Sequence, residues 1–236
     1  ELEPDARLYA AVIGACSKAR RWDWALHSFR EMQERGVQAK AAAYNAAISA
    51  YQRGGLWQHG LALFQELPTR HVVPTVVTYN AALNACKAGS HWAGALEVLR
   101  QMRERAVPPD DITYGTAISA AEKGQQWGLA LHLLREMQAA TARPNLLAYS
   151  AAMSACEKGQ QSRWAWVLLR EMQAALVEPD IIAYNAALSA AEKGEWAWSF
   201  ELFSELIAGA VEPSVVTYSA VISASEKGGQ WQRAVD

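Results

Sequence analysis

Side chains that both donate and accept hydrogen bonds recur at one place in this sequence, directly after a tyrosine. The amide or hydroxyl group stands at Asn45, Asn80, Ser150, Asn185 and Ser219, and the two other copies have Ala10 and Gly115. A carboxamide offers two N–H donors and a carbonyl acceptor, and a hydroxyl offers a donor and an acceptor oxygen. These groups suit recognition by hydrogen bonds. The residue type changes from copy to copy while its neighbours stay nearly constant, so we expect specificity to be encoded here.

A second set of chemical groups, which we call the basic row, follows the same tyrosines by nine residues. It consists of Lys18, Arg53, Lys123, Lys158, Lys193 and Lys227. Only Ala88 interrupts it, beside Lys87. The chain has a formal charge of −2, so a polyanion would need local cations of this kind. The row fits a ladder of phosphate contacts. It also fits solvated helix ends, where cations favour the negative end of the helix dipole, and the two interpretations are compatible.

Residue patterns for catalysis or metal binding do not occur. The five histidines share no metal-ligand spacing, and there is no His-Glu-x-x-His or Cys-x-x-Cys motif. A glycine-rich phosphate loop and a nucleophile motif are absent as well. We therefore predict that this span is not an enzyme and takes no cofactor, metal or small-molecule substrate. No run approaches the ~20 apolar residues of a membrane span, so no membrane association is expected.

The elements that position these groups follow from the spacing of the tyrosines. Five gaps of 35 residues and a last gap of 34 separate Tyr9, Tyr44, Tyr79, Tyr114, Tyr149, Tyr184 and Tyr218. A fixed period of this size is typical of a tandem array. Within 76–110, one apolar stripe of helical spacing runs from Tyr79 to Cys86 and a second from Trp92 to Met102. Each period thus predicts two helices of roughly 12 residues joined by a short turn.

The predicted fold is all-α, an α-solenoid (superhelix) of tandem helix-turn-helix repeats of about 35 residues. Full repeats are expected at 6–40, 41–75, 76–110, 111–145, 146–180 and 181–214, with a partial repeat at 215–236. Residues 1–5 match the tail of a repeat, so we expect both ends of the chain to interrupt repeats. Cys16, Cys86 and Cys156 lie two repeats apart, beyond the ~4.4–6.8 Å between Cα atoms that a disulfide needs, and are predicted to be small buried thiols.

Glycine and tryptophan recur around the turn inside each repeat. The glycines are Gly54, Gly89, Gly124, Gly159, Gly194 and Gly228, and we expect them to supply the left-handed cap of the first helix. Tryptophan opens the second helix at Trp22, Trp57, Trp92, Trp127 and Trp231. Because these positions belong to the packing stripe, we predict that the indoles are core residues rather than a platform for bases.

The motifs around the tyrosines resemble one known family. Val76-Val-Thr-Tyr-Asn80, Ile181-Ile-Ala-Tyr-Asn185 and Val215-Val-Thr-Tyr-Ser219 open units that close with Val107-Pro-Pro-Asp110 or Val177-Glu-Pro-Asp180. With the second helix of the type seen from Ala130 to Met137, this pattern is similar to the pentatricopeptide repeat (PPR) family over essentially the whole chain. The tetratricopeptide repeat, of nearly the same period, opens with Trp-x-x-Leu-Gly-x-x-Tyr, which this chain lacks.

The resemblance implies sequence-selective binding of single-stranded RNA, with one base for each repeat. In that family the residue after the tyrosine and the last residue of the repeat read the base; we call these the base-reading positions. Here they are Asn45, Thr75, Asn80, Asp110, Gly115, Asn145, Ser150, Asp180, Asn185, Ser214 and Ser219. An apolar residue two before the tyrosine packs against the base. These base-sandwiching positions are Val77, Ile112, Leu147, Ile182 and Val216.

Helix capping is the competing interpretation of the last residue in each repeat, because Asp, Asn, Ser and Thr are the preferred N-caps. Capping does not explain the variation after the tyrosine. In the first repeat Arg7 replaces the apolar residue, and Ala10 and Lys40 occupy the base-reading places, so we expect no discrimination there. For the following five repeats the family pattern implies the order 5′-pyrimidine-U-A-G-C-3′.

Two other functions compete with RNA binding. A protein-interaction scaffold would use the concave face of the solenoid, and protein partners are then expected. Alternatively, the span belongs to an enzyme whose catalytic domain lies outside it. The resemblance also implies a location in the mitochondrion or plastid, and a role in transcript processing, stability, editing or translation.

Overall fold

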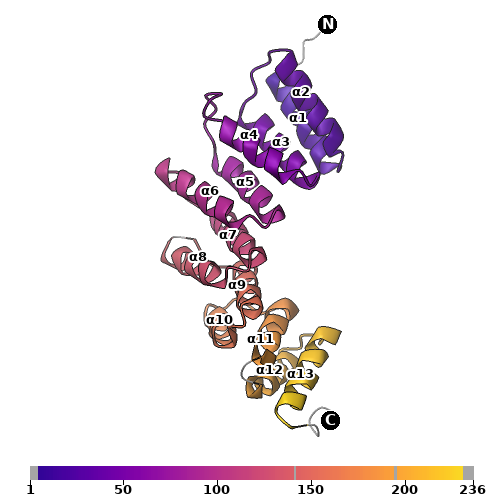
Figure 1. Cartoon of the computed structure of the whole chain (residues 1–236), viewed down its shortest axis with the longest axis vertical. Helices are drawn as coiled ribbons and strands as arrows, with labels where there is room; N and C mark the ends of the chain where they lie inside the picture. The colour runs from indigo at the N-terminus through magenta and orange to yellow at the C-terminus, as the bar shows by residue number, and fades with distance from the viewer. Residues whose placement is uncertain (1–4, 141, 194–195, 231–236) are drawn as a thin grey trace. The chain divides into compact units, whose positions relative to one another are not determined.

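The computed structural model describes residues 5–140, 142–193 and 196–230, and these residues form thirteen α-helices and no strand (Figure 1). The helices alternate between the first and the second helix of a hairpin. The first helices are α1 (Ala6–Lys18), α3 (Ala41–Arg53), α5 (Val76–Ala88), α7 (Asp111–Lys123), α9 (Leu146–Lys158), α11 (Ile181–Lys193) and α13 (Val215–Lys227). The second helices are α2 (Trp22–Glu34), α4 (Trp57–Glu66), α6 (Trp92–Glu104), α8 (Trp127–Ala139), α10 (Ser162–Ala174) and α12 (Ala197–Ala208). The predicted all-α fold of the solenoid class is confirmed.

The helices group into two compact units, Glu1–Ala120 and Ala121–Asp236. In the first unit α1, α3 and α5 pack on one another in sequence, and each also packs against its own second helix. In the second unit α9, α11 and α13 form the same kind of inner layer, and α8, α10 and α12 contact the first helix that follows each of them. First helices therefore build one layer within each unit, and second helices build the other.

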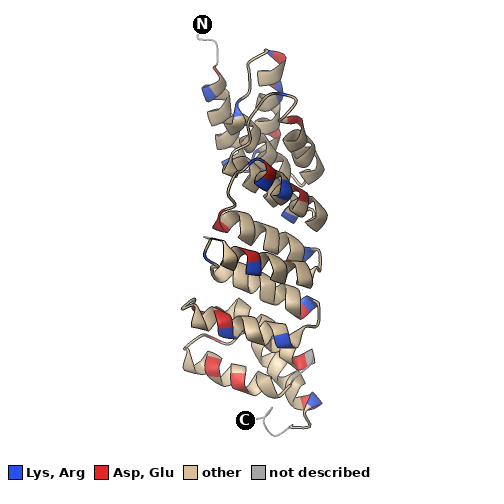
Figure 2. Ribbon diagram, turned by 90° about the vertical axis from the view of Figure 1, so that its left-hand side faces the viewer, with Lys and Arg blue, Asp and Glu red and all other residues tan. Residues whose placement is uncertain are grey.

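The apolar stripes of the sequence form the core between these layers. Tyr79, Leu83 and Cys86 of α5 are fully buried, as are Leu99 and Met102 of α6. Burial of one such leucine contributes roughly 1.5–3 kcal/mol, so a stripe of this kind in every repeat is the main source of stability. Figure 2 shows that segments coloured for Lys or Arg often lie next to segments coloured for Asp or Glu.

The glycine that ends each first helix does not adopt the left-handed conformation that its recurrence suggested. Its φ is −79° at Gly54, −87° at Gly89 and −80° at Gly159. The left-handed residue is the next one, such as Gly55 with φ 76° or Ser90 with φ 52°. Serine and glutamine also occupy that next position, so the turn itself does not require a glycine.

The glycine is required by the tryptophan of the preceding repeat. A Cβ atom added to Gly54 would lie 2.8 Å from the ring of Trp22, and one added to Gly159 would lie 2.4 Å from that of Trp127. These indoles thus pack across the seam between repeats, and Trp22 itself remains partly exposed. Gly194 and Trp231 lie outside the described residues.

Candidate nucleic-acid interface

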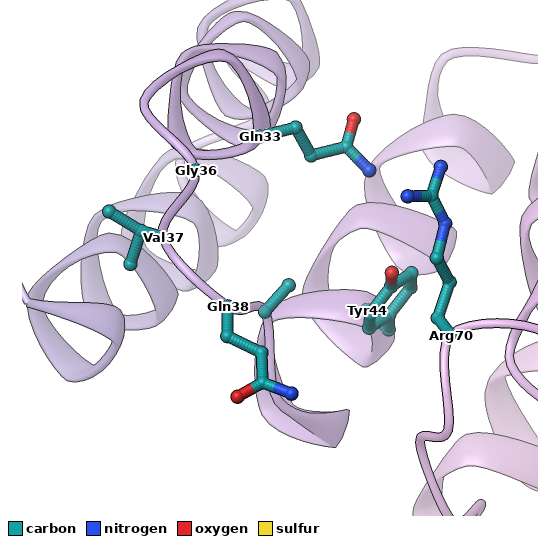
Figure 3. Close-up of a pocket in the computed structure, with 7 residues that line it drawn as sticks. Gln33, Gly36, Val37, Gln38, Tyr44 and Arg70 are labelled. Atoms are coloured by element: carbon teal, nitrogen blue, oxygen red, sulfur yellow. The ribbon is translucent and has the colours of Figure 1, made fainter.

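The tyrosines anchor the first helices and so set the direction of the residues beside them. Tyr44, Tyr79 and their equivalents are buried from the first repeat to the sixth. Figure 3 shows Gln33, Tyr44 and Arg70 pointing into a cavity of about 230 Å³ from α2, α3 and the loop after α4. Burial raises the pKa of the Tyr44 hydroxyl, which therefore stays protonated and neutral. With the tyrosine held inward, the residue after it lies at the edge of the packed layer.

The base-sandwiching positions are apolar and exposed. Their exposed fractions are 64% and 62% for Val77 and Ile112 in the first unit, and 57%, 58% and 54% for Leu147, Ile182 and Val216 in the second. Each side chain stands three residues before a base-reading residue, so the two lie on one face of the helix. Folding does not require an aliphatic side chain in solvent at the same place in successive repeats. This face is therefore available to pack against a flat apolar ligand.

In the repeat at 76–110 the two base-reading residues contact each other. Asn80 Nδ2 donates a hydrogen bond to Asp110 Oδ1 over 3.3 Å. Thr113, at the start of the next first helix, places its hydroxyl 2.8 Å from Asn80 Oδ1 and 2.7 Å from Asp110 Oδ1. Its backbone N–H also donates to Asp110 Oδ1 over 2.8 Å. The asparagine, the aspartate and the threonine thus form one polar cluster across the seam.

The repeat at 181–214 has the same arrangement with a serine in place of the aspartate. Asn185 Nδ2 donates to Ser214 Oγ over 3.1 Å, and Thr217 Oγ1 donates to Asn185 Oδ1 over 2.6 Å. The two hydroxyl oxygens of Ser214 and Thr217 are 3.1 Å apart. Both clusters are half-buried, so their hydrogen bonds are stronger than those of fully solvated groups.

The other base-reading residues of the first helices do not form such a cluster. Asn45 Oδ1 and Ser150 Oγ are buried side-chain atoms for which no hydrogen-bond partner is found among the described residues. Ser219 is exposed, and its hydroxyl donates to Val215 O over 2.8 Å within α13. Gly115 is buried and has no side chain to offer. The sequence positions are therefore alike, but the hydrogen-bonding states of their side chains differ.

The last residues of the repeats cap the helices that follow them. Backbone N–H groups donate to Asn145 Oδ1 over 3.0 Å, to Asp180 Oδ1 over 2.9 Å and to Ser214 Oγ over 3.3 Å. Thr75 bonds to Thr78 through its backbone N–H over 3.0 Å. The last residues of the repeats therefore do act as helix caps. Two of them, Asp110 and Ser214, also bond to a base-reading asparagine of the preceding first helix.

The cluster around Asp110 affects its ionisation. Burial alone would raise the pKa of this carboxyl group, but hydrogen bonds from Thr113 and Asn80 favour the charged form. The net effect is a pKa below the ordinary aspartate value. Asp110 is therefore a carboxylate at neutral pH and accepts hydrogen bonds without donating any.

The cations of the basic row have different surroundings in the two units. In the first unit Lys18, Arg20 and Arg53 line a cavity of about 600 Å³ together with Trp22. Arg53 also donates from Nη1 to the carbonyl oxygen of Ser17 over 2.5 Å. Three cations around one open cavity make a local positive surface that a phosphate could enter.

In the second unit two lysines of the row are paired with glutamates of the preceding repeat. Lys158 forms an ion pair with Glu122, and Lys227 Nζ lies 3.0 Å from Glu192 Oε1. A paired lysine attracts a phosphate less strongly, because the glutamate cancels most of its field. Lys123 is exposed, and the side chain of Lys193 lies outside the described residues.

One further position on this face was not singled out by the sequence patterns. It stands four residues after each base-reading residue of the first helix, hence on the same side, and is occupied by Ser49, Asn84, Ser119, Ser154, Ser189 and Ser223. Asn84 Nδ2 donates to the backbone oxygen of Asn80 over 2.9 Å. The i, i+4 spacing from a base-reading residue would have identified it.

Other kinds of site are not found in the described part of the chain. It has no group of three or more His, Cys, Asp or Glu side chains that could hold a metal ion. None of its helices has the length and apolar character needed to cross a bilayer. All three cysteines are free thiols; Cys86 and Cys156 are buried, while Cys16 in the first hairpin is half-buried.

Comparison with solved structures finds the same architecture. The PPR protein PPR10 in complex with an 18-nt psaJ RNA element matches with a TM-score of 0.71 and 24% identity, over 98% of this chain and 33% of that one. A structure of PPR10 from maize matches with a TM-score of 0.62 and 18% identity, over 100% of this chain and 38% of that one. The chain thus spans about a third of PPR10.

The PPR domain of Arabidopsis thaliana protein-only RNase P 1 (PRORP1) in complex with tRNA is also similar. It matches with a TM-score of 0.68 and 18% identity, over 82% of this chain and 98% of that domain. Comparison with curated protein sequences found no match.

Family models match at several places along the sequence. The PPR repeat model matches residues 7–37, and the PPR repeat family model matches residues 74–123. The pentatricopeptide repeat domain model matches residues 27–89 and 167–227, together more than half of the chain. With helical hairpins of the same period in the structure, these matches show that the chain belongs to the pentatricopeptide repeat family.

Proposed function

We propose that this chain binds single-stranded RNA sequence-selectively, with one base taken by each repeat. The observation that carries the proposal is the exposed aliphatic side chain that stands about one helical turn before the base-reading position of five first helices, as at Val77 and Asn80. Such a pair offers an apolar surface for a base plane and a polar group for its edge. The complexes of PPR10 with an 18-nt RNA element and of the PRORP1 domain with tRNA support RNA as the ligand.

The base identities follow from the residue pairs. Asn80 with Asp110 takes U, Asn185 with Ser214 takes C, and Ser150 with Asp180 takes G. Gly115 with Asn145 favours A, and Asn45 with Thr75 takes a pyrimidine. The proposed core target is 5′-pyrimidine-U-A-G-C-3′, bound parallel to the protein chain, with phosphates contacted by the basic row.

We further propose that this span is not itself catalytic and acts by occupying a transcript. Processing, stabilisation, editing or translation of an organellar transcript, in the mitochondrion or plastid, is the setting that the family suggests. Protein partners that act on the bound transcript fit the same role.

Selection of RNAs from a randomised pool tests the proposal directly, followed by titration of the selected RNA by fluorescence anisotropy. Val77→Ser should weaken binding by about 1 kcal/mol, since it removes one apolar contact with a base. Val73→Ser is the matched control: Val73 is also exposed but lies in the loop before α5, so its replacement should leave affinity unchanged. Equal affinity for all RNAs in the pool would contradict sequence selectivity.

A protein-interaction scaffold predicts a different result. In that case no RNA would be enriched, and Val77→Ser would weaken a protein complex rather than an RNA complex. The two functions are therefore separated by one pair of variants and two binding assays.

A further inference from the structure

Two buried threonines hold the amide oxygens of base-reading asparagines. Thr113 Oγ1 lies 2.8 Å from Asn80 Oδ1, and Thr217 Oγ1 lies 2.6 Å from Asn185 Oδ1. Both threonines are fully buried, and each stands immediately before the tyrosine of the next repeat. We call a threonine at this place a junction threonine; the third is Thr78.

We infer that the junction threonine is a positioning residue that fixes which end of the asparagine amide faces the RNA. The inference rests on the proposed function and deepens it, since it adds a third residue to the pair that determines the base. An amide that turns by 180° exchanges its carbonyl acceptor for its NH₂ donor. A base-reading asparagine is selective only if one of these orientations is held.

The sequence pairs asparagine with threonine at every junction. Threonine follows the three asparagines, as Asn45 with Thr78, Asn80 with Thr113 and Asn185 with Thr217. Alanine takes that place after the other three residues, as Ala10 with Ala43, Gly115 with Ala148 and Ser150 with Ala183. The threonine is therefore present where an amide needs orienting and absent where there is none.

Each junction threonine also takes part in helix capping, because its hydroxyl accepts the backbone N–H of the last residue of the repeat, over 3.0 Å at Thr78, 3.2 Å at Thr113 and 2.9 Å at Thr217. Capping alone does not account for the pairing with asparagine, because the carboxylates of Asp110 and Asp180 both cap a helix by accepting a backbone N–H, over 2.8 and 2.9 Å. Yet the first is followed by Thr113 and the second by Ala183. The difference between the two junctions is the base-reading residue of the earlier helix, which is Asn80 in one and a serine in the other.

The three junctions hold the amide to different degrees. At Asn185 the orientation depends on Thr217, because Ser214 is a hydroxyl and can accept or donate. At Asn80 the Asp110 carboxylate, which only accepts, also requires the NH₂ group to face it. At Asn45 the amide oxygen is buried without a partner among the described residues.

This arrangement leaves one N–H of the asparagine for the ligand. Asn185 Nδ2 has two hydrogens, and Ser214 Oγ accepts one of them. With its oxygen turned toward Thr217, the half-buried amide presents its remaining N–H to the ligand as a donor. It then selects a base that places a carbonyl oxygen or unprotonated ring nitrogen at this edge.

The test measures base preference at one site with four RNAs that differ only in the base opposite Asn185. Thr217→Val removes the hydroxyl and keeps the shape, whereas Thr217→Ser keeps the hydroxyl. Since a good contact with a base edge discriminates by about five- to 150-fold, Thr217→Val should lower the preference ratio at least about fivefold. Thr217→Ser should retain it. Ser225→Ala, which removes a buried hydroxyl that donates to Val221 O in the same helix, should also retain it.

The order of effects is a second readout. Thr113→Val should reduce the ratio opposite Asn80 by less than Thr217→Val reduces the ratio opposite Asn185, because Asp110 still holds the amide. Thr78→Val should have the smallest effect. If Thr217→Val weakens all four RNAs equally and leaves the ratio intact, the threonine is only structural and the inference is wrong.

A gain of selectivity tests the same relationship in reverse. Ser150→Asn alone should discriminate partly at its site, because the Asp180 carboxylate can accept from the amide NH₂ group. Ser150→Asn with Ala183→Thr should raise the preference to one like that of Asn80. Equal selectivity in the single and double variants would overturn the role of the threonine.

A measurement without RNA separates this inference from the proposed function. The side-chain amide protons of Asn185 should exchange with solvent faster in Thr217→Val than in Thr217→Ser, as seen by NMR. Unchanged exchange would show that the hydroxyl does not hold the amide. A wild-type chain that holds the amide but binds no RNA would overturn both the proposed function and this use of the threonine.

Discussion

Gly89 lies so close beneath the indole of Trp57 that a Cβ atom added to the glycine would be 2.3 Å from Trp57 Cε2. The two residues belong to consecutive repeats, and the backbone conformation of Gly89 is one that any residue adopts, with φ −87°. The absence of a side chain at Gly89 therefore allows Trp57 of one repeat to pack over the end of the first helix of the next repeat.

Replacement of this glycine should destabilise the fold. We expect Gly89→Ala to lower the free energy of unfolding by ~1–3 kcal/mol, because the indole must shift to admit a methyl group. The control is Gly14→Ala in α1, where nothing lies within 4 Å of the added Cβ. That change should raise stability by ~0.5–1 kcal/mol, since alanine is the better helix former. Denaturant titrations followed by circular dichroism measure both, and equal effects would contradict the close-packing argument.

A change of base preference is expected from one base-reading substitution. Asn80→Ser should shift the base at that site from U toward G and cost the original base ~1–3 kcal/mol, because the amide contact to its edge is lost. Selection from a randomised RNA pool should show the change at this position and at no other. A shift elsewhere would contradict the assignment of one base to one repeat.

The cations of the basic row should contribute unequally to RNA affinity. Replacement of Lys18 and Arg53 by alanine should weaken binding to all sequences and reduce the slope of log K against log salt by ~1.4, about 0.7 for each phosphate contact on a single strand. The paired Lys158 and Lys227 should contribute less when replaced in the same way.

The ion pairs provide the converse test. Glu192→Gln removes the negative charge paired with Lys227 and should strengthen binding and steepen the salt dependence. Isothermal titration at several salt concentrations measures both quantities. If replacement of Lys158 and Lys227 weakens RNA binding as much as replacement of Lys18 and Arg53, pairing with glutamate does not reduce their contribution to affinity.

Acid should remove the stability contributed by Asp110. Its pKa is lowered in the folded chain, below the unfolded value of about 3.9, so the folded state favours the carboxylate. The contribution is fully present above the unfolded pKa and is lost as pH falls through the lowered folded pKa. The difference in unfolding free energy between wild type and Asp110→Asn should therefore shrink as pH falls below about 4. A difference that is constant with pH would rule out this ionic contribution.

Two cysteines should resist alkylation in the folded chain. Burial raises the pKa of Cys86 and of Cys156 to about 12, so almost no thiolate exists at about pH 8. Mass spectrometry after treatment with iodoacetamide should find both unmodified in the native protein and modified after denaturation. Rapid labelling of Cys86 under native conditions would mean that α5 opens readily.

Local features of this chain could be predicted from its sequence, because each depends on residues within one period. The stripe from Tyr79 to Cys86 specifies a helix and its buried face, and the exposure of Val77 follows from its place on the opposite side. The role of Gly89 was wrongly predicted, since it depends on Trp57, a residue of another repeat. Likewise the pairing of Lys158 with Glu122 joins side chains 36 positions apart that no short motif relates.

The cluster of Asn80, Asp110 and Thr113 bears on how such arrays can be cut and joined. An exchange of residues 76–110 between two proteins imports the asparagine and the aspartate but leaves the threonine behind. The interval 80–113 carries all three. For engineering by recombination, the transferable cassette therefore begins just after one tyrosine and ends just before the next, offset from the helical hairpin itself.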